Sequence, residues 1–244
     1  MNLDCIRRLL LKLIDAVPFM PDQRGENWEE HADIDFLQDL YDKIGWNTWR
    51  GLNLKVLHEA IMDVWKDKLS RNVEEPIMVL DVGCFTGDYF GKLMEFKDIP
   101  QFRYFGVDIT PEFVRRSSER WRDYQNARFN VMSAGDLRYE DSGFDVVFCF
   151  GLLIHVRDIR KSVSEFFRVS RQAVIISVDT TTTNKYTDIY GKTAKYYYRA
   201  YSEDWTRRIL EEYGKIKKIC KMEMKDHNYG IPLYNSVLYC LVDK

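Results

Sequence analysis

The segment 79–89, with the sequence VLDVGCFTGDY, constrains the fold of this chain more than any other stretch. It starts as an apolar run that reaches Asp81, and two glycines, Gly83 and Gly87, then turn the chain toward a helix. Because glycine has no Cβ atom, such a turn can tighten and let a ligand approach the main chain. This pattern is typical of a buried parallel strand that presents its end to a nucleotide-like ligand.

A second apolar run, 102–107, ends at Asp108, 25 positions after Gly83. A carboxylate at that place can accept both hydroxyl protons of a ribose. The two features together indicate an adenosine-containing cofactor at the edge of an α/β sheet. A dinucleotide would need the pattern G-x-G-x-x-G, whose closely spaced glycines hold a pyrophosphate. Phe85 stands where the middle glycine would be, so the spacing disfavours NAD.

The rest of the chain predicts an α/β three-layer sandwich built on a mostly parallel, seven-stranded sheet. Strands are expected near 77–82, 103–108, 127–132, 144–150 and 173–179, with helices near 87–96, 111–124 and 158–170. Such alternation calls for a parallel sheet with helices on both faces. A further helix near 202–213 is followed by strands near 215–222 and 234–242, which we expect to form an antiparallel hairpin at the C-terminal edge.

The residues before the sheet predict a helical cap. Apolar residues recur at helical spacing over 2–17, 33–44 and 52–69. We therefore expect an N-terminal helical cap over residues 1–70 and one compact Rossmann-like domain over residues 71–244. The 244 residues suffice for one sizeable α/β domain with small additions.

Composition excludes several classes of protein. A net charge of −2 argues against generic nucleic-acid binding. Apolar stretches stay well below the ~20 residues of a membrane span. The 5 cysteines form no C-x-x-C pair, which favours a reducing, cytoplasmic compartment. The 4 histidines lie singly and near no cysteine pair, which disfavours zinc.

The glycine turn resembles the first motif, D/E-x-G-x-G-x-G, of the class I S-adenosylmethionine-dependent methyltransferases. Asp81, Gly83 and Gly87 occupy the family positions, and Phe85 replaces the middle glycine. The resemblance extends over roughly residues 76–180 and implies a Rossmann-like fold with S-adenosyl-L-methionine as the cofactor. Metal-dependent catechol O-methyltransferases would have an adjacent Asp-Asn pair after the fifth strand. Here Asp179 is followed by Thr180, so we expect no metal.

The resemblance also implies the residues that line the cofactor. Asp108 matches the ribose-binding acid, although a carboxylate that caps the next helix is the alternative. Either Ser133 or Asp136 would reach the adenine amine, with the main chain of Ala134 beside it, while Asp136 could equally cap a turn. The full set is Asp81, Gly83, Cys84, Phe85, Gly87, Asp108, Ile109, Ser133, Ala134, Asp136, Phe150 and Gly151.

The acceptor side is less strongly marked. His155 is the candidate catalytic residue, since it matches a family position that is sometimes near the acceptor, and a structural histidine is the alternative. Residues 180–201 form a long insertion that we expect to be a loop acting as a lid, in which Lys195, Tyr198 and Arg199 could pair with or stack on the acceptor. A solvated basic face explains the same residues. Trp46 and Arg50 are candidates for a second wall of the acceptor site. The alternative is that they pack a helix of the cap against the sheet.

These observations predict methyl transfer from S-adenosyl-L-methionine to a small, anionic or aromatic metabolite. The alternatives are an enzyme that methylates RNA or protein, a nicotinamide enzyme, and a cofactor-binding partner subunit without activity. We expect a small-molecule acceptor as the partner, with neither nucleic acid nor membrane. The sequence does not reveal the oligomeric state.

Overall fold

A computed structural model describes residues 35, 38–39, 42–43, 45–156, 159–181, 186–189, 198–223 and 234–242. Its helices are α4 (Trp49–Ser70), α5 (Asp88–Met94), α6 (Pro111–Arg120), α7 (Ile159–Val169) and α8 (Glu203–Glu211), with a short 3-10 helix η1 (Leu153–His155). Its strands are β1 (Ile77–Val82), β2 (Phe102–Asp108), β3 (Ala127–Val131), β4 (Phe144–Phe150), β5 (Ser170–Thr181), β6 (Tyr186–Ile189), β7 (Tyr198–Ser202), β8 (Gly214–Glu223) and β9 (Tyr234–Val242). The expected helix at 2–17 lies outside the described residues.

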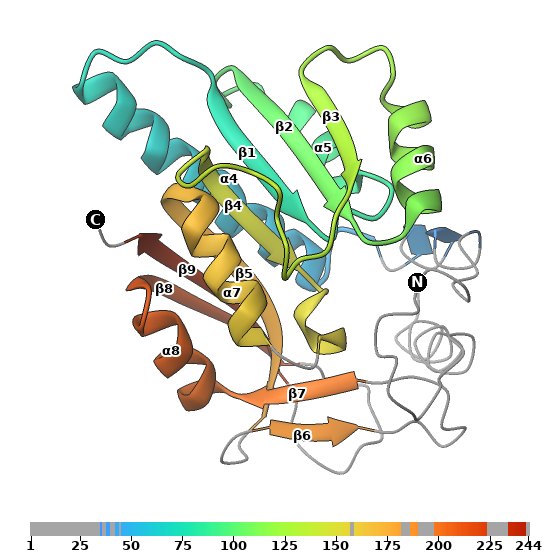
Figure 1. Cartoon of the computed structure of the whole chain (residues 1–244), viewed down its shortest axis with the longest axis vertical. Helices are drawn as coiled ribbons and strands as arrows, with labels where there is room; N and C mark the ends of the chain where they lie inside the picture. The colour runs from blue at the N-terminus through green and yellow to red at the C-terminus, as the bar shows by residue number, and fades with distance from the viewer. Residues whose placement is uncertain are drawn as a thin grey trace.

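The described strands form one sheet whose main part is parallel. Strands β3, β2, β1, β4 and β5 follow one another in parallel, and β9 then pairs antiparallel with both β5 and β8. Figure 1 shows β8 and β9 side by side at the C-terminal edge. The mostly parallel sheet with its antiparallel edge hairpin is therefore confirmed.

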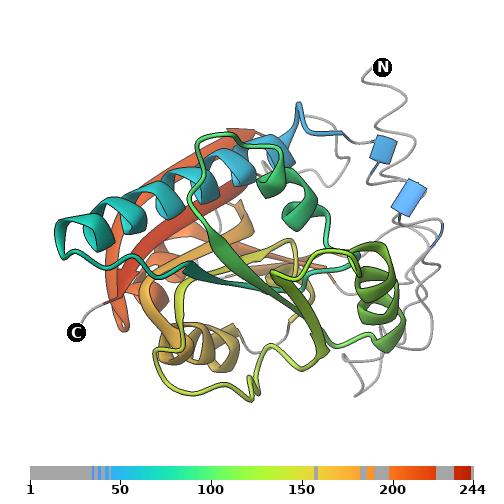
Figure 2. The ribbon, with the colours of Figure 1, turned by 90° about the horizontal axis from the view of Figure 1, so that it is seen from above.

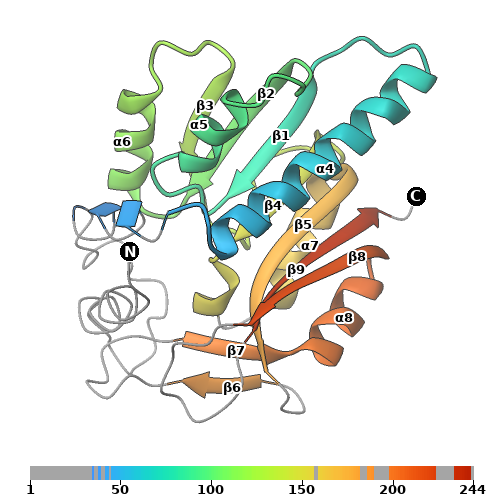
Figure 3. The same cartoon turned by 180° about the vertical axis from the view of Figure 1, so that it is seen from behind.

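Helices cover both faces of this sheet. Helices α7 and α8 lie on the near face in Figure 1, whereas α4 and α5 lie on the other face, which is turned to the viewer in Figure 3. Figure 2 shows the sheet between these layers. Alternate strand residues serve the two sides: Leu80 and Val147 enter the core under α7, and Val79 and Val146 enter the core under α4. The predicted three-layer sandwich is confirmed.

The segment 180–201 differs from the expected loop, because it contains strands β6 and β7. These two strands pair antiparallel with each other, and β7 continues the sheet beside Thr180 and Thr181 at the end of β5. The stretch is rich in tyrosine and threonine, which favour strands. The sheet has nine strands among the described residues, two more than the sequence predicts.

Helix α4 crosses the back of β4, β5 and β9 (Figure 3). Thr48 begins it as the N-cap, since its side chain accepts a hydrogen bond from the main-chain N–H of Arg50. One face of the helix is buried against the sheet, with Val56, Leu57, Ala60, Ile61 and Val64 in the core. The helix thus shares the core of the sheet, and a domain boundary near residue 70 stays a prediction.

A buried ion pair joins the end of α4 to β4. The ammonium of Lys68 lies 2.9 Å from Oδ2 of Asp145, and both side chains are almost completely buried. The main-chain N–H of Met78 also donates to this oxygen, while Arg171 donates to Oδ1 at 3.0 Å. The carboxylate of Asp145 is therefore fully compensated inside the protein.

Candidate functional site

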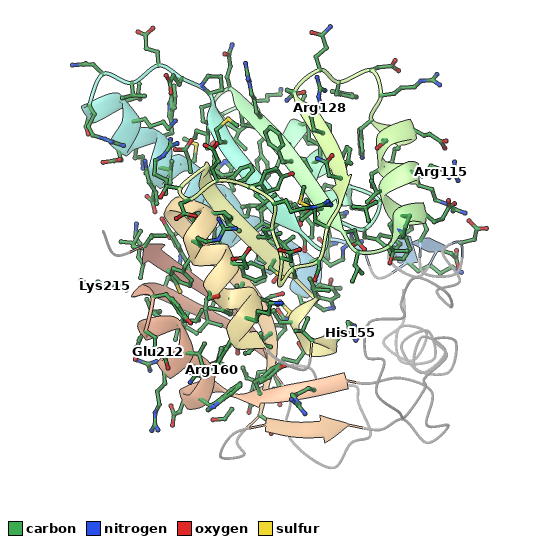
Figure 4. The ribbon with its side chains drawn as sticks, viewed as in Figure 1. Arg115, Arg128, His155, Arg160, Glu212 and Lys215 are labelled. Atoms are coloured by element: carbon green, nitrogen blue, oxygen red, sulfur yellow. The ribbon has the colours of Figure 1, made fainter. Side chains whose placement is uncertain are left out.

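The loops that follow β1, β2, β3 and β4 meet at one edge of the sheet, because parallel strands end on the same side. The expected cofactor residues lie in or beside these four loops. His155 at the end of η1, labelled in Figure 4, lies toward this edge, whereas Arg128 lies near the amino end of β3. The fold thus gathers sequence-distant residues into one candidate site.

The first loop is held directly against the end of β2. The main-chain N–H groups of Gly83 and Cys84 both donate to the carbonyl of Val107, at 2.8 and 3.0 Å. Gly83 has φ +81°, and a Cβ atom there would lie 3.0 Å from the Cβ of Leu152 in the loop after β4. The turn therefore requires glycine both for its conformation and for the close approach of the neighbouring loop.

Asp108 at the end of β2 connects the first two loops. Its Oδ2 accepts the main-chain N–H of Phe85 at 3.1 Å, and its Oδ1 accepts that of Thr110 at 3.0 Å. Burial raises the pKa of Asp108 above its ordinary value, and these two N–H groups oppose the rise. A carboxylate offers about four lone-pair sites, so the two oxygens retain capacity for a further pair of donors.

Phe85 stands at the position of the middle glycine in the motif D/E-x-G-x-G-x-G, and it adopts a glycine-like backbone conformation. Its φ is +51°, in the left-handed region that side chains seldom adopt. Its ring packs edge-on against Phe113 of α6 at 4.5 Å, and its carbonyl accepts the hydroxyl of Ser117 at 2.7 Å. These contacts hold the strained residue in place.

Two aromatic rings fill the space beside the glycines of this region. A Cβ atom on Gly87 would lie 2.7 Å from Nε1 of Trp121, and one on Gly91 would lie 2.6 Å from the same indole. A Cβ atom on Gly106 would lie 2.6 Å from the ring of Phe129. The indole also donates to the carbonyl of Thr86 at 3.2 Å, which fixes its position. We call Trp121 and Phe129 the aromatic wall.

Asp81 lies beneath the loop rather than at its surface. It is 2% exposed, and the hydroxyl of Tyr104 donates a hydrogen bond to its Oδ2. Burial raises the pKa of Asp81 to about 8, although the hydrogen bond from Tyr104 acts in the opposite direction. The carboxyl group is therefore mostly protonated near neutral pH.

Asp88, at the start of α5, anchors the candidate residues Arg50 and Trp46. Arg50 donates to Oδ2 of Asp88 at 2.7 Å, Arg120 pairs with the same carboxylate, and the guanidinium of Arg50 stacks on Trp46 at 4.2 Å. Burial alone would raise the pKa of Asp88, but the two guanidinium groups bring it below its usual value. The structure thus places Trp46 and Arg50 beside the glycine turn, with Arg50 engaged by Asp88.

The residues expected near adenine form a tight turn after β3. The main-chain N–H of Met132 donates to the carbonyl of Asp108 at 3.0 Å, which brings this turn beside β2. Ser133 accepts the N–H of Asp136 with its carbonyl, and Ala134 lies between them. Asp136 is exposed, whereas Ser133, Ala134 and Ile109 are half-buried.

Phe150 ends β4, and the loop that follows it carries Gly151 and His155. The hydroxyl of Tyr201 in β7 donates to the carbonyls of Leu153 and Val156, at 3.1 and 2.9 Å, and so fastens η1 to the segment expected as a lid. Arg199 lies on β7, opposite Asp188 of β6. Lys195 lies outside the described residues, and for Tyr198 the structure describes only the main chain.

Sequence reasoning missed a polar network behind this loop. The amide Nδ2 of Asn53 lies 3.3 Å from the hydroxyl of Tyr89 and 3.5 Å from Oγ of Ser177, which also accepts the N–H of Gly151. Asn235 donates to Asp179 at 3.1 Å. Strand pairing across 56 positions brings Asp179 and Asn235 together, so no local spacing could reveal them.

Two features are absent from the described residues. None of their helices combines the length and apolar character needed to cross a membrane. Within the same part of the chain, no three His, Cys, Asp or Glu side chains are grouped to hold a metal ion. Independence from metal stays a prediction.

Comparison with known proteins gives a family and several relatives. The methyltransferase-domain family matches residues 74–229, more than half of the chain. Over 114 residues the chain is 32% identical to the ubiquinone/menaquinone biosynthesis C-methyltransferase UbiE of Rickettsia felis, a match that covers 43% of this chain and 45% of that protein. The chain spans less than half the length of the curated relatives it matches.

Solved structures show the same fold at low sequence identity. The [4+2]-cyclase SpnF has a TM-score of 0.60 at 13% identity, covering 98% of this chain and 93% of that chain. Magnesium protoporphyrin IX methyltransferase (ChlM) from Synechocystis PCC 6803, solved with bound SAH, has a TM-score of 0.54 at 17% identity, covering 87% and 100%. These similarities establish the architecture and do not identify the reaction.

Proposed function

The chain belongs to the methyltransferase-domain family, and on that premise we propose that it transfers a methyl group from S-adenosyl-L-methionine to a small-molecule acceptor. The observation that carries the proposal is the pairing of Asp108 with the glycine turn. The hydrogen bond from Phe85 to Asp108 fixes the acid beside the loop, where its remaining lone pairs suit a ribose diol.

The residues of the site fit this cofactor. Gly83 lets the loops after β1 and β4 approach closely, and Gly151, with φ +75° and no atom of the described residues within 4 Å of its Cβ position, continues that edge. A sulfonium is already an activated leaving group, so the protein mainly aligns nucleophile and methyl group. Such positioning contributes roughly 7–11 kcal/mol when the reacting atoms are well oriented.

For the acceptor, the comparisons support a chemical class and not a particular compound. UbiE and magnesium protoporphyrin IX methyltransferase are named for small molecules, which supports a small acceptor here. Because η1 is fastened to β7, His155 and Arg199 belong to neighbouring elements. We propose that these two residues, with Lys195 and Tyr198, contact an anionic or aromatic acceptor.

Ligand-dependent stabilisation tests the cofactor. The midpoint temperature of thermal unfolding should rise with S-adenosylhomocysteine and not with NADH. A ligand present at a hundred times its dissociation constant stabilises the folded state by about 2.7 kcal/mol. The substitution Asp108→Ala should weaken S-adenosylhomocysteine binding by about 1–3 kcal/mol through lost ribose hydrogen bonds. The exposed Asp123→Ala is the control and should bind normally. Stabilisation by NADH alone would reject the proposal.

A protein named as a [4+2]-cyclase has the same fold, so methyl transfer must be tested separately from cofactor binding. Incubation with methyl-labelled cofactor and a metabolite extract, followed by mass spectrometry, should yield a labelled small molecule. Label on RNA or protein would instead support a macromolecular acceptor. Cofactor binding without consumption across such extracts would favour a binding subunit.

A further inference from the structure

A buried group of polar side chains lies behind the loop after β4, on the face of the sheet covered by α4. Asn53 of α4 and Ser177 of β5 are 0% exposed, while Asp179 of β5 and Asn235 of β9 are 6% and 5% exposed. Ser177 and Asp179 share this face because strand residues alternate, and Asn235 pairs directly with Asp179. Three elements therefore converge on one polar patch.

The patch is connected to the candidate cofactor site. Gly151 donates its main-chain N–H to Oγ of Ser177 at 3.1 Å, and Asn53 lies 3.5 Å from the same oxygen. Tyr89, just after the glycine turn, is 3.3 Å from Asn53. The group thus begins at the loop after β4 and continues along β5 to the pairing of Asp179 with Asn235.

Two hydrogen-bond acceptors in this patch are unused. Oδ1 of Asn53 and Oδ1 of Asn235 are buried and have no hydrogen-bond partner among the residues that the structure describes. The carboxylate of Asp179 fixes the orientation of Asn235, since a carboxylate oxygen accepts the donated N–H. Buried amide oxygens without a donor are unfavourable, so their presence points to a ligand that supplies N–H or O–H groups.

We propose that Asn53, Asp179 and Asn235 form the acceptor subsite and select an acceptor whose nucleophile is an amine or a hydroxyl group. This inference rests on the proposed function and deepens it. The two amide oxygens would orient the N–H or O–H donors of the acceptor, and the carboxylate of Asp179 would receive the proton that leaves. A carbon nucleophile without such donors would leave these oxygens unpaired.

The step balances with these groups. A lone pair on the acceptor nitrogen or oxygen forms the new bond to the methyl carbon. The carbon–sulfur bond breaks, and its electron pair stays on sulfur as a neutral thioether. The proton of the acceptor passes to Asp179 and then to water. Burial raises the pKa of Asp179 to about 6, opposed by the amide of Asn235, which suits a carboxylate that accepts a proton near neutral pH.

The analogue sinefungin tests the subsite without knowledge of the acceptor, because it carries an amine where the transferable methyl group would be. Calorimetry would compare its affinity with that of S-adenosylhomocysteine in the full chain. We expect Asp179→Asn, which keeps the shape and the bond from Asn235, to weaken sinefungin about tenfold or more through loss of a charge-assisted hydrogen bond. S-adenosylhomocysteine should change less than twofold. The exposed Asp141→Asn is the matched control.

A second variant protects the test from a folding defect. Asn53→Leu removes an unpaired oxygen from a different element and should cause the same selective loss. An equal loss of both ligands would overturn the inference, because the patch would then hold the amino-acid part of the cofactor. Unchanged affinity for sinefungin would overturn it as well. Failure of S-adenosylhomocysteine to bind the unsubstituted protein would instead reject the proposed function itself.

Discussion

The substitution Gly87→Ala should destabilise the protein far more than the same change at Gly151. Both glycines have nearly the same positive φ, +74° and +75°. An alanine in this left-handed conformation costs about 1–2 kcal/mol at either position. Only at Gly87 would the new Cβ atom meet the aromatic wall, 2.7 Å from Nε1 of Trp121, whereas a Cβ atom at Gly151 would meet none of the described residues within 4 Å.

The indole cannot easily move aside, because it donates to Thr86 and packs edge-on against Phe90. Overpacking of this kind adds about 1–3 kcal/mol. The free energy of unfolding should therefore fall by about 2–5 kcal/mol in Gly87→Ala and by about 1–2 kcal/mol in Gly151→Ala. Urea denaturation without ligand, at unchanged m-value, measures both. If both variants lose the same free energy of unfolding, the steric argument is refuted. The left-handed backbone conformation would then account for the whole loss.

Two buried carboxyl groups give further predictions. Between about pH 4 and pH 8 the folded state holds the proton of Asp81 that the unfolded chain has lost, so the free energy of unfolding falls as pH rises. Asp81→Asn keeps an acceptor for Tyr104. In urea denaturation, the free energy of unfolding of this variant should increase relative to that of the unsubstituted protein from pH 5 to pH 8. Parallel pH profiles of the two proteins would contradict this prediction. Lys68→Met leaves Asp145 buried with Met78 and Arg171 as partners and should cost about 3 kcal/mol. Adding Asp145→Asn should recover part of that loss, and a purely additive double variant would argue against the ion pair.

Local patterns were enough to predict the central sheet. The alternation of apolar runs and turns gave β1 to β5 within a few residues, and α6 begins at Pro111, where a helix was expected. The glycine turn and Asp108 lie together because both features follow adjacent parallel strands. Such signals are contained within short stretches of chain, so a single sequence reveals them.

Long-range pairing was out of reach. Strands β6 and β7 looked like a loop because the stabilising partner of β7, the end of β5, lies about twenty positions earlier in the chain. The contact of Asp179 with Asn235 depends on antiparallel pairing of β5 with β9. The engagement of Arg50 by Asp88 depends on how α4 crosses the sheet. These contacts arise from tertiary packing, which periodicity does not encode.

The aromatic wall has a consequence for the order of folding. Gly87 precedes Trp121 by 34 positions and Phe129 by 42, so the rings that shape the turn come from the residue after α6 and from β3. Contacts of this separation form late relative to local helices, since loop-closure entropy opposes them. A nascent chain that ends before residue 129 would contain every glycine of the motif but not the complete aromatic wall that packs against the turn. Competence to hold a ligand should therefore appear only after these later residues have docked.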